Sequence, residues 1–239
     1  MSPPRIAKIL TLNGRVSRAK GLGRSARHQR DKLERIKRAA RALFGRNGFE
    51  ATTTREIAEA ADIGAGTLFL YAGTKEDLLV LIFREEVGRE VDKAFATIKQ
   101  RPLEVQLLHV FGAMIAHHER NPGLARVFVK ELPFVRDRRH GVHAFMSSLL
   151  GRIANLIERA QKRGDLSGDV SPSHLAHNLF ALYFAELQSW LGAAGQSANQ
   201  RDARLAAALE LHLQGLRTAA IAHPPLPNHS GPRSARRAT

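Results

Sequence analysis

Apolar residues recur at intervals of three and four along most of the chain, and this spacing predicts α-helices. The first helix is expected over residues 31–46, because Asn47-Gly48 is a typical helix stop. Its apolar positions are Leu33, Ile36, Ala40, Leu43 and Phe44. Further helices are expected over residues 74–99, 102–120, 124–132, 141–163, 175–191 and 202–222. No segment favours a strand, so the pattern predicts an all-α chain.

Residues 53–75, TTREIAEAADIGAGTLFLYAGTK, differ from this pattern because they contain two short apolar segments instead of one long one. The apolar positions of the first segment are Ile57, Ala58 and Ala61. A break at Asp62-Ile63-Gly64 separates it from a second segment over residues 65–71. Thr53 and Glu56 have the spacing of a capping box, which starts a helix. Two short helices joined by a tight turn predict a helix-turn-helix, whose second helix enters the DNA major groove.

The residues in and around this motif follow a specific pattern. They are Leu43-Phe44, Gly48-Phe49, Thr52-Thr53, Ile57-Ala58, Ile63-Gly64, Gly66-Thr67-Leu68-Phe69, Tyr71, Lys75-Glu76 and Leu78-Leu79. This pattern resembles the tetracycline-repressor (TetR) family of bacterial transcriptional regulators over residues 30–90. The resemblance implies an N-terminal three-helix DNA-binding domain, a C-terminal helical bundle that dimerises, and repression as the usual outcome. The chain departs from the family at Gly64, Phe69 and Ala72, where Ser, Tyr and Phe are usual.

The resemblance also implies which residues contact DNA. Phosphates are expected to be held by Thr52, Thr53, Thr67, Tyr71 and Lys75. The outer face of the second motif helix includes Ala65, Gly66 and Phe69, which offer few hydrogen bonds to bases. Arg55, at the start of the first motif helix, is the best candidate for a base or phosphate contact. Lys75 lies in the first turn of its helix, where the macrodipole disfavours a cation; in the family the matching lysine meets a phosphate.

The charge of the chain favours a polyanionic partner. The formal net charge is +15, and residues 1–30 hold eight Lys or Arg and no acid. A large positive charge attracts nucleic acid but does not indicate a fold. Residues 1–29 are expected to form a flexible basic arm, which either contacts DNA or is a solvated tail. Residues 223–239 contain four prolines and several arginines, and they are expected to form a disordered basic tail.

The remaining segment, residues 91–222, is expected to bind an effector and to dimerise. The helix over residues 175–191 is apolar on nearly all sides, which predicts burial against more than one partner. With the helix over 202–222 it could form a four-helix interface with a second copy of the chain. In a TetR-like domain, a cavity for an apolar small molecule would be lined by Phe111, Met114, Phe128, Phe145, Leu149 and Tyr183. These six residues could equally be plain core.

Several kinds of chemistry find no support in the sequence. The chain has no cysteine, so it has neither disulfides nor thiolate metal sites, which fits a reducing cytoplasm. No run of about 20 apolar residues predicts a membrane span. His140-x-x-His143 and His174-x-x-His177 have a possible metal-ligand spacing but no third ligand, so no metal and no cofactor are predicted. No catalytic triad or carboxylate pair is recognisable, so the chain is not expected to be an enzyme.

These observations predict a cytoplasmic, homodimeric regulator that binds a palindromic operator in double-stranded DNA. A ligand would shift the dimer towards a conformer that no longer matches the operator. Two other classes of protein stay open. One is a largely sequence-indifferent DNA-coating protein that uses its basic arm. The other is an enzyme whose active site lies in the C-terminal domain.

Overall fold

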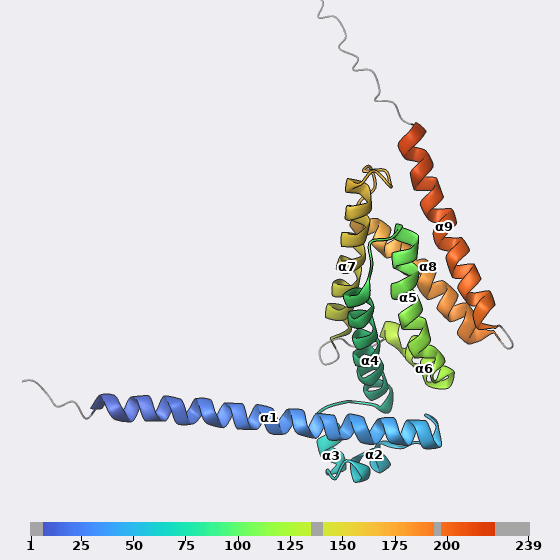
Figure 1. The fold of residues 1–239 in the computed structure, drawn as a ribbon. Coiled ribbons are helices and arrows are strands. Elements are labelled where there is room, and N and C mark those ends of the chain that lie inside the picture. Colours follow the sequence, from blue (N-terminus) through green and yellow to red (C-terminus); the bar gives the residue numbers. More distant parts are fainter. Residues whose placement is uncertain (1–6, 135–140, 194–196, 223–239) are drawn as a thin grey trace, which may run out of the picture. The chain divides into compact units, whose positions relative to one another are not determined.

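The computed structural model describes residues 7–134, 141–193 and 197–222, and every regular element in these ranges is a helix (Figure 1). The α-helices are α1 (Ala7–Asn47), α2 (Thr54–Ala60), α3 (Ala65–Leu68), α4 (Lys75–Thr97), α5 (Leu103–Glu119), α6 (Pro122–Glu131), α7 (Val142–Lys162), α8 (Pro172–Gly192) and α9 (Ala198–Ala222). A short 3-10 helix, η1 (Leu132–Phe134), follows α6. The prediction of an all-α fold is confirmed. No helix in the described ranges has both the length and the hydropathy that crossing a bilayer requires.

The first helix is much longer than the sequence pattern predicts. It begins at Ala7 instead of residue 31, so residues 7–29, which were expected to form a flexible arm, are helical in the structure. Proline is absent between Pro4 and the end of α1, so no backbone N–H is missing there. Arginine, lysine, leucine and alanine, which are common in this segment, are strong helix formers. The predicted tail over residues 223–239 lies outside the described residues.

The structure contains two compact units. The first joins the chain up to Lys93 with residues 113–146, and the second joins residues 94–112 with the chain from Ser147 onward. The end of α5 and all of α6 therefore pack in the same unit as α1 to α4, although the sequence pattern placed them in the second domain.

The core of the first unit brings the short motif helices against two long ones. Its fully buried side chains include Ile36 and Phe44 of α1, Ile57 of α2, Leu68 of α3, and Leu78, Leu79 and Ile82 of α4. Phe44 also lies 5.2 Å from Phe49, measured between ring centroids. Burial of such side chains contributes about 1.5–3 kcal/mol each, so tertiary packing stabilises helices as short as α2 and α3.

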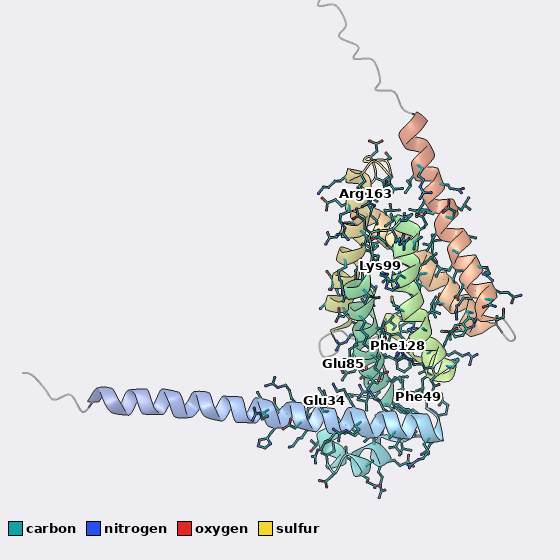
Figure 2. The ribbon with its side chains drawn as sticks, viewed as in Figure 1. Glu34, Phe49, Glu85, Lys99, Phe128 and Arg163 are labelled. Atoms are coloured by element: carbon teal, nitrogen blue, oxygen red, sulfur yellow. The ribbon has the colours of Figure 1, made fainter. Side chains whose placement is uncertain are left out.

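Ion pairs tie α1 to α4 within this unit. Lys37 Nζ lies 2.7 Å from Glu85 Oε2, and the lysine also pairs with Glu34 one turn before it. Arg41 Nε donates to Glu86 Oε1 at 2.6 Å. Glu34 and Glu85 are both marked in Figure 2. Because Lys37 is almost fully buried, its charge depends on these carboxylates.

The second unit packs α7, α8 and α9 with the first part of α5. Its buried residues include Leu149 and Ile153 of α7, Leu179, Tyr183 and Leu187 of α8, and Leu205, Leu209 and Leu213 of α9. Phe111 of α5 stacks on Tyr183, with ring centroids 4.8 Å apart. The other apolar side of α8 is only half-buried; it carries Phe180, Leu182, Phe184 and Trp190.

Candidate DNA-binding site

The start of α2 is fixed by the predicted capping box. Thr53 Oγ1 accepts a hydrogen bond from the backbone N–H of Glu56 at 3.2 Å, and Glu56 Oε2 accepts one from the backbone N–H of Thr53 at 2.8 Å. The Thr53 hydroxyl also donates to Glu56 Oε2 at 2.9 Å, and these two donors to the carboxylate stabilise its ionised form, so they lower the pKa of Glu56. Such a reciprocal pair satisfies two backbone N–H groups that a helix start leaves without partners. The prediction of a capping box is confirmed.

The turn between α2 and α3 has a defined backbone conformation. Asp62 has φ +53°, in the left-handed region that Asp tolerates better than most residues. Arg35 of α1 holds this residue, because its guanidinium donates to the Asp62 carboxylate at 3.4 Å and to the Asp62 carbonyl at 3.3 Å. The predicted break at Asp62-Ile63-Gly64 is therefore present, and α1 holds it in place.

The second motif helix is shorter than predicted. Regular α-helix extends only over α3, and the backbone continues as turns up to Ala72. The Leu70 N–H donates to Thr67 C=O at 3.2 Å, and the Tyr71 N–H donates to Leu68 C=O at 2.9 Å. Both bonds span three residues, a tighter spacing than the four residues of an α-helix. Gly64 precedes the helix and provides no side-chain cap. The prediction of a two-turn helix over residues 65–71 is wrong in length, although its position is correct.

The outward side of this segment is mostly carbon. Ala65 and Gly66 are exposed, and Phe69 and Leu70 expose 48% and 73% of their surfaces. Thr67 and Tyr71 are half-buried. Leu68 and Ala72 are fully buried and hold the segment against the unit. The segment is thus exposed, as entry into a groove requires, and Thr67 and Tyr71 supply its only side-chain hydroxyls.

Arg55 is placed as its predicted role requires. Its side chain is exposed on α2, and its guanidinium pairs with the exposed carboxylate of Glu59 at 3.0 Å. An exposed pair of this kind contributes little to stability, so the guanidinium can exchange the carboxylate for a phosphate at small cost. The contact with DNA itself stays a prediction.

Thr52 and Lys75 have different surroundings from those that the resemblance implies. Thr52 is buried, and its hydroxyl donates to Gly48 C=O at 2.7 Å. Lys75 Nζ donates to the carbonyls of Phe49, Glu50 and Thr52 at 2.9, 3.2 and 3.3 Å. All three ammonium protons of Lys75 are therefore used inside the protein. These contacts argue against the predicted phosphate roles of both residues, because both side chains hold the link between α1 and α2.

Three basic residues in the second half of α1 are also paired internally. Arg35, Lys37 and Arg41 bind Asp62, Glu85 and Glu86 respectively. The sequence could not show these pairs, because each joins residues that lie 27 or more positions apart. Lys32 and Arg38 are exposed on the same helix, so they are the better candidates for phosphate contacts.

The six predicted effector-lining residues divide between the two units. In the first unit Met114 and Phe128 are buried and Phe145 is half-buried; in the second Phe111, Leu149 and Tyr183 are buried. None of the six lines any of the three cavities found among described residues. Tyr183 is nevertheless unusual. Burial raises the pKa of its phenol, and the hydroxyl has no hydrogen-bond partner among the described residues.

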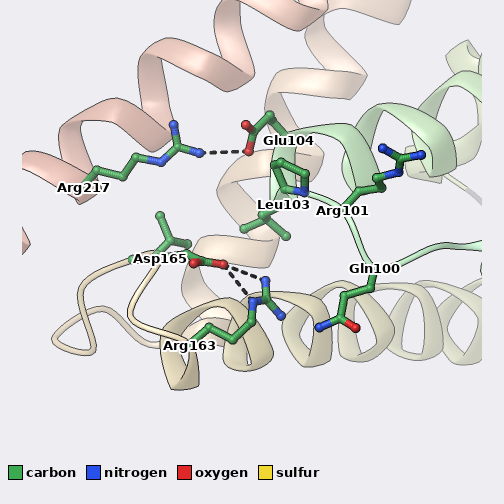
Figure 3. A pocket seen from close by; sticks show the side chains of 9 residues that line it. Gln100, Arg101, Leu103, Glu104, Arg163, Asp165 and Arg217 are labelled. Atoms are coloured by element: carbon green, nitrogen blue, oxygen red, sulfur yellow. Dashed lines mark hydrogen bonds and ion pairs between the residues drawn. The ribbon is translucent and has the colours of Figure 1, made fainter.

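The largest of the three cavities, about 470 Å³, lies in the second unit, and most of the residues that line it are charged (Figure 3). Arg217 of α9 binds Glu104 of α5 at 2.9 Å, and Arg163 binds Asp165 at 2.7 Å. This cavity therefore does not match the apolar effector site that the sequence predicts. No group of three possible metal ligands occurs in the described ranges; His140 lies outside them, and His177 Nδ1 lies 2.7 Å from Ser173 C=O.

Comparison with known proteins agrees with this geometry. The model for "Bacterial regulatory proteins, tetR family" matches residues 36–82, from the middle of α1 into α4. The transcriptional repressor KstR of Mycolicibacterium smegmatis is 27% identical over 168 residues, which cover 68% of this chain and 78% of KstR.

Solved structures extend the similarity beyond the motif. The repressor FadR of Thermus thermophilus, in complex with lauroyl-CoA, is 29% identical with a TM-score of 0.57, covering 83% of this chain and all of FadR. FadR of Bacillus subtilis, in complex with stearoyl-CoA, shares the fold at 21% identity, with a TM-score of 0.60 and coverage of 76% of this chain and 98% of that one. Motif, fold and relatives agree: residues 36–82 match the tetR family of bacterial regulatory proteins, and the chain is a DNA-binding transcriptional regulator with a helix-turn-helix.

Proposed function

We propose that the protein is a ligand-responsive repressor that binds a palindromic operator in double-stranded DNA as a homodimer, in the cytoplasm. The observation that carries this proposal is the exposed segment from Ala65 to Tyr71. Arg35 fixes the turn before it, and buried Leu68 and Ala72 hold it from behind. A rigid, protruding segment can enter the major groove without an ordering cost.

Electrostatic attraction would supply much of the affinity. The chain carries a net charge of +15, and neutralised phosphates release counterions, so binding should weaken steeply with salt. Exposed Arg55 of α2 and Lys32 and Arg38 of α1 are cations that can turn to the backbone of DNA. The predicted contacts of Thr53, Thr67 and Tyr71 stay part of the proposal, whereas those of Thr52 and Lys75 do not.

The dimer interface is proposed on α8 and α9, within the second unit. Half-buried Phe180 and Phe184 stack at 6.1 Å between ring centroids, and Leu211 of α9 exposes 74% of its surface. A self-complementary pairing of these two helices would bury this apolar surface around a twofold axis. Twofold symmetry in the protein corresponds to an inverted repeat in the operator.

The effector is proposed to be an apolar small molecule, and a fatty acyl-CoA is the candidate that the FadR of Thermus thermophilus supports. The unpartnered hydroxyl of Tyr183 supports a ligand in the second unit, because a buried polar atom without a partner costs free energy that a bound group could recover. Ligand binding would favour a conformer with lower operator affinity.

The first test is selection of bound fragments from randomised DNA with the full-length protein at near-physiological salt. The proposal requires an inverted repeat among the recovered sequences. Lauroyl-CoA should then release the selected operator, whereas free coenzyme A at the same concentration should not. Release by neither compound would rule out the acyl-CoA effector while leaving operator binding intact.

A sequence-indifferent DNA-coating protein is the second candidate. It is favoured by the low hydrogen-bonding capacity of the exposed segment and by the basic, helical residues 7–29. Replacing Arg15, Arg18, Lys20, Arg24 and Arg27 by glutamine removes charge and keeps strong helix formers. A coating protein would lose nearly all binding, whereas an operator-specific repressor would lose only part of its affinity.

A further inference from the structure

Another of the three cavities, of about 330 Å³, lies entirely within the first unit. It is bounded by α1, by α4 and by the corner between α5 and α6. Its apolar wall is formed by Phe44, Leu79, Ile82, Phe83 and Leu124. Two of these are aromatic, and all but Leu124 are otherwise almost fully buried. The volume is at the lower end of the range of small-molecule sites, about 300–1,000 Å³. The cavity is therefore large enough for a ligand with one or two rings.

The remaining wall of this cavity is charged, with one positive charge in excess. Arg41, Arg89 and Arg120 face it together with Glu86 and Glu90. Arg41 binds Glu86 at 2.6 Å and Arg120 binds Glu90 at 3.3 Å. Arg89 approaches Glu86 only to 3.9 Å, so Arg89 is the cation with the weakest carboxylate contact. An anionic group would complete this set of charges.

His117 lines the same cavity with unused hydrogen-bonding capacity. The side chain is 6% exposed, and neither ring nitrogen makes a hydrogen bond to any described residue. Its Nε2 lies 3.5 Å from Glu86 Oε2, beyond the optimal distance. Burial lowers the pKa of His117, so the ring is neutral at pH 7 and can donate through one nitrogen. Buried polar atoms without partners are rare in folded proteins, and a bound acceptor would satisfy this one.

We propose that this cavity binds a small organic anion with an aromatic body, such as an aromatic carboxylate. The ring would lie against Phe44 and Phe83, the carboxylate would pair with Arg89 and Arg120, and His117 would donate to it. The site is separate from the proposed acyl effector site, since all its residues belong to the first unit. Binding to it does not depend on the proposed operator recognition, because it can be measured without DNA.

Occupation of this cavity would affect the link between α1 and α4. The Arg41–Glu86 pair forms part of both the cavity wall and this link. A carboxylate bound by Arg89 and Arg120 adds a negative charge beside Glu86, so it weakens the Arg41–Glu86 ion pair between α1 and α4. By reciprocity, any effect of the anion on DNA affinity must appear equally as an effect of DNA on anion affinity.

The test is calorimetric titration of the full-length protein with 2-naphthoate, without DNA. Gly45 of α1 lines the cavity, and a Cβ placed there meets no atom within 4 Å, so Gly45→Met can fill the space without a clash. Gly112→Met, at a helical glycine with equally open space, is the matched control. We expect binding to the native protein and to Gly112→Met, and affinity at least tenfold lower for Gly45→Met. The variant Arg120→Gln should lose severalfold.

The neutral analogue 2-naphthylmethanol separates the charge from the ring. We expect it to bind at least fivefold more weakly than 2-naphthoate to the native protein. Absence of 2-naphthoate binding would overturn the proposal. So would equal affinity for Gly45→Met and the native protein, because the anion would then occupy some other place. Equal binding of the neutral analogue would remove the assigned role of the arginines.

Discussion

Lys75 places its ammonium group where three backbone carbonyls of the α1–α2 link converge. The ammonium also lies 4.4 Å from the centroid of the Phe49 ring. A cation in the first turn of a helix is unfavourable for the helix dipole, and these contacts offset that cost. At the residue scale, therefore, a side chain that the family pattern assigns to DNA stabilises the fold.

Replacing Lys75 by alanine should consequently lower stability and leave the salt dependence of DNA binding unchanged. Hydrogen bonds from a charged donor contribute about 1.5–3 kcal/mol each in general, and water can replace part of them here. We expect the free energy of unfolding to fall by about 2 kcal/mol, measured by urea denaturation.

Arg55→Ala is the matched control for Lys75→Ala. It should change stability by less than about 0.5 kcal/mol, yet reduce the slope of log affinity against log salt by about 1. The opposite pattern, in which Lys75→Ala keeps stability and flattens the slope, would restore the phosphate role of Lys75.

His118 makes the stability of the first unit dependent on pH. Burial, reinforced by the neighbouring His117, lowers the pKa of His118 from 6.5 to about 4. The unfolded chain therefore takes up the proton first as pH falls, so the folded state loses stability between pH 6.5 and pH 4. The pKa of His117 is lowered as well, which adds to the loss in the same direction.

We expect this effect to appear as a loss of about 2 kcal/mol in unfolding free energy between pH 7 and pH 5 from His118 alone. His118→Gln should show a correspondingly smaller difference between the two pH values, whatever its stability at pH 7. His177→Gln, which alters an exposed histidine of α8, should behave as the native protein does. An unaltered pH dependence in His118→Gln would show that other groups cause it.

At the scale of elements, the contact between α1 and α4 determines how the motif is held. Lys37 is almost fully buried and depends on Glu85 of α4 and on Glu34 of its own helix. Breaking a buried pair leaves a charge without compensation, which costs more than the pair contributes. This contact connects the helix-turn-helix to the helix that leads into the rest of the chain.

Glu85→Gln should therefore destabilise the protein by about 2 kcal/mol, less than a fully unpaired lysine would cost because Glu34 remains. Glu59→Gln removes a carboxylate of the same kind from an exposed pair, and it should cost less than about 0.5 kcal/mol. Thermal melting of the two variants checks this difference. Equal melting temperatures would show that Lys37 is solvated in solution.

The limits of the sequence-based prediction also lie at this scale. Four of the five predicted apolar positions of α1 are buried and Leu33 is half-buried, and the capping box of α2 is present, so local spacing predicts these features well. The start of α1 and the length of α3 do not follow from local spacing. The start of α1 depends on the absence of a helix-breaking residue, and the length of α3 depends on packing. The internal partners of Lys75 and Lys37 depend on contacts distant in sequence, and the resemblance that assigned Lys75 to phosphate contains no information about such contacts.

For the whole molecule, the proposed function requires two copies of the chain in a fixed arrangement. The proposed interface on α8 and α9 combines half-buried aromatic residues with the exposed Leu211. A helix pair with such a surface would be poorly soluble alone, and a second copy would cover it. This interface would then set the distance along the DNA between the helix-turn-helix motifs of the two copies.

Leu211→Asp should consequently weaken dimerisation at least tenfold, measured by sedimentation equilibrium of the full-length protein. A buried carboxylate without a partner is costly at any interface. Phe134→Asp, which places the same charge at an equally exposed apolar residue of η1, should stay dimeric. If both variants kept twice the mass of one chain, the interface would lie elsewhere.

The carbon-rich exposed segment, with Phe69 and Leu70 outermost, restricts what the protein can recognise in a base pair. A surface that offers few donors and acceptors distinguishes bases chiefly through the thymine C5-methyl group, the one apolar feature of the major groove. An operator synthesised with uracil in place of thymine should then bind less tightly, although every Watson–Crick pair is retained. Because 5-methylcytosine carries the same methyl group, DNA methylation at the operator would be visible to this regulator.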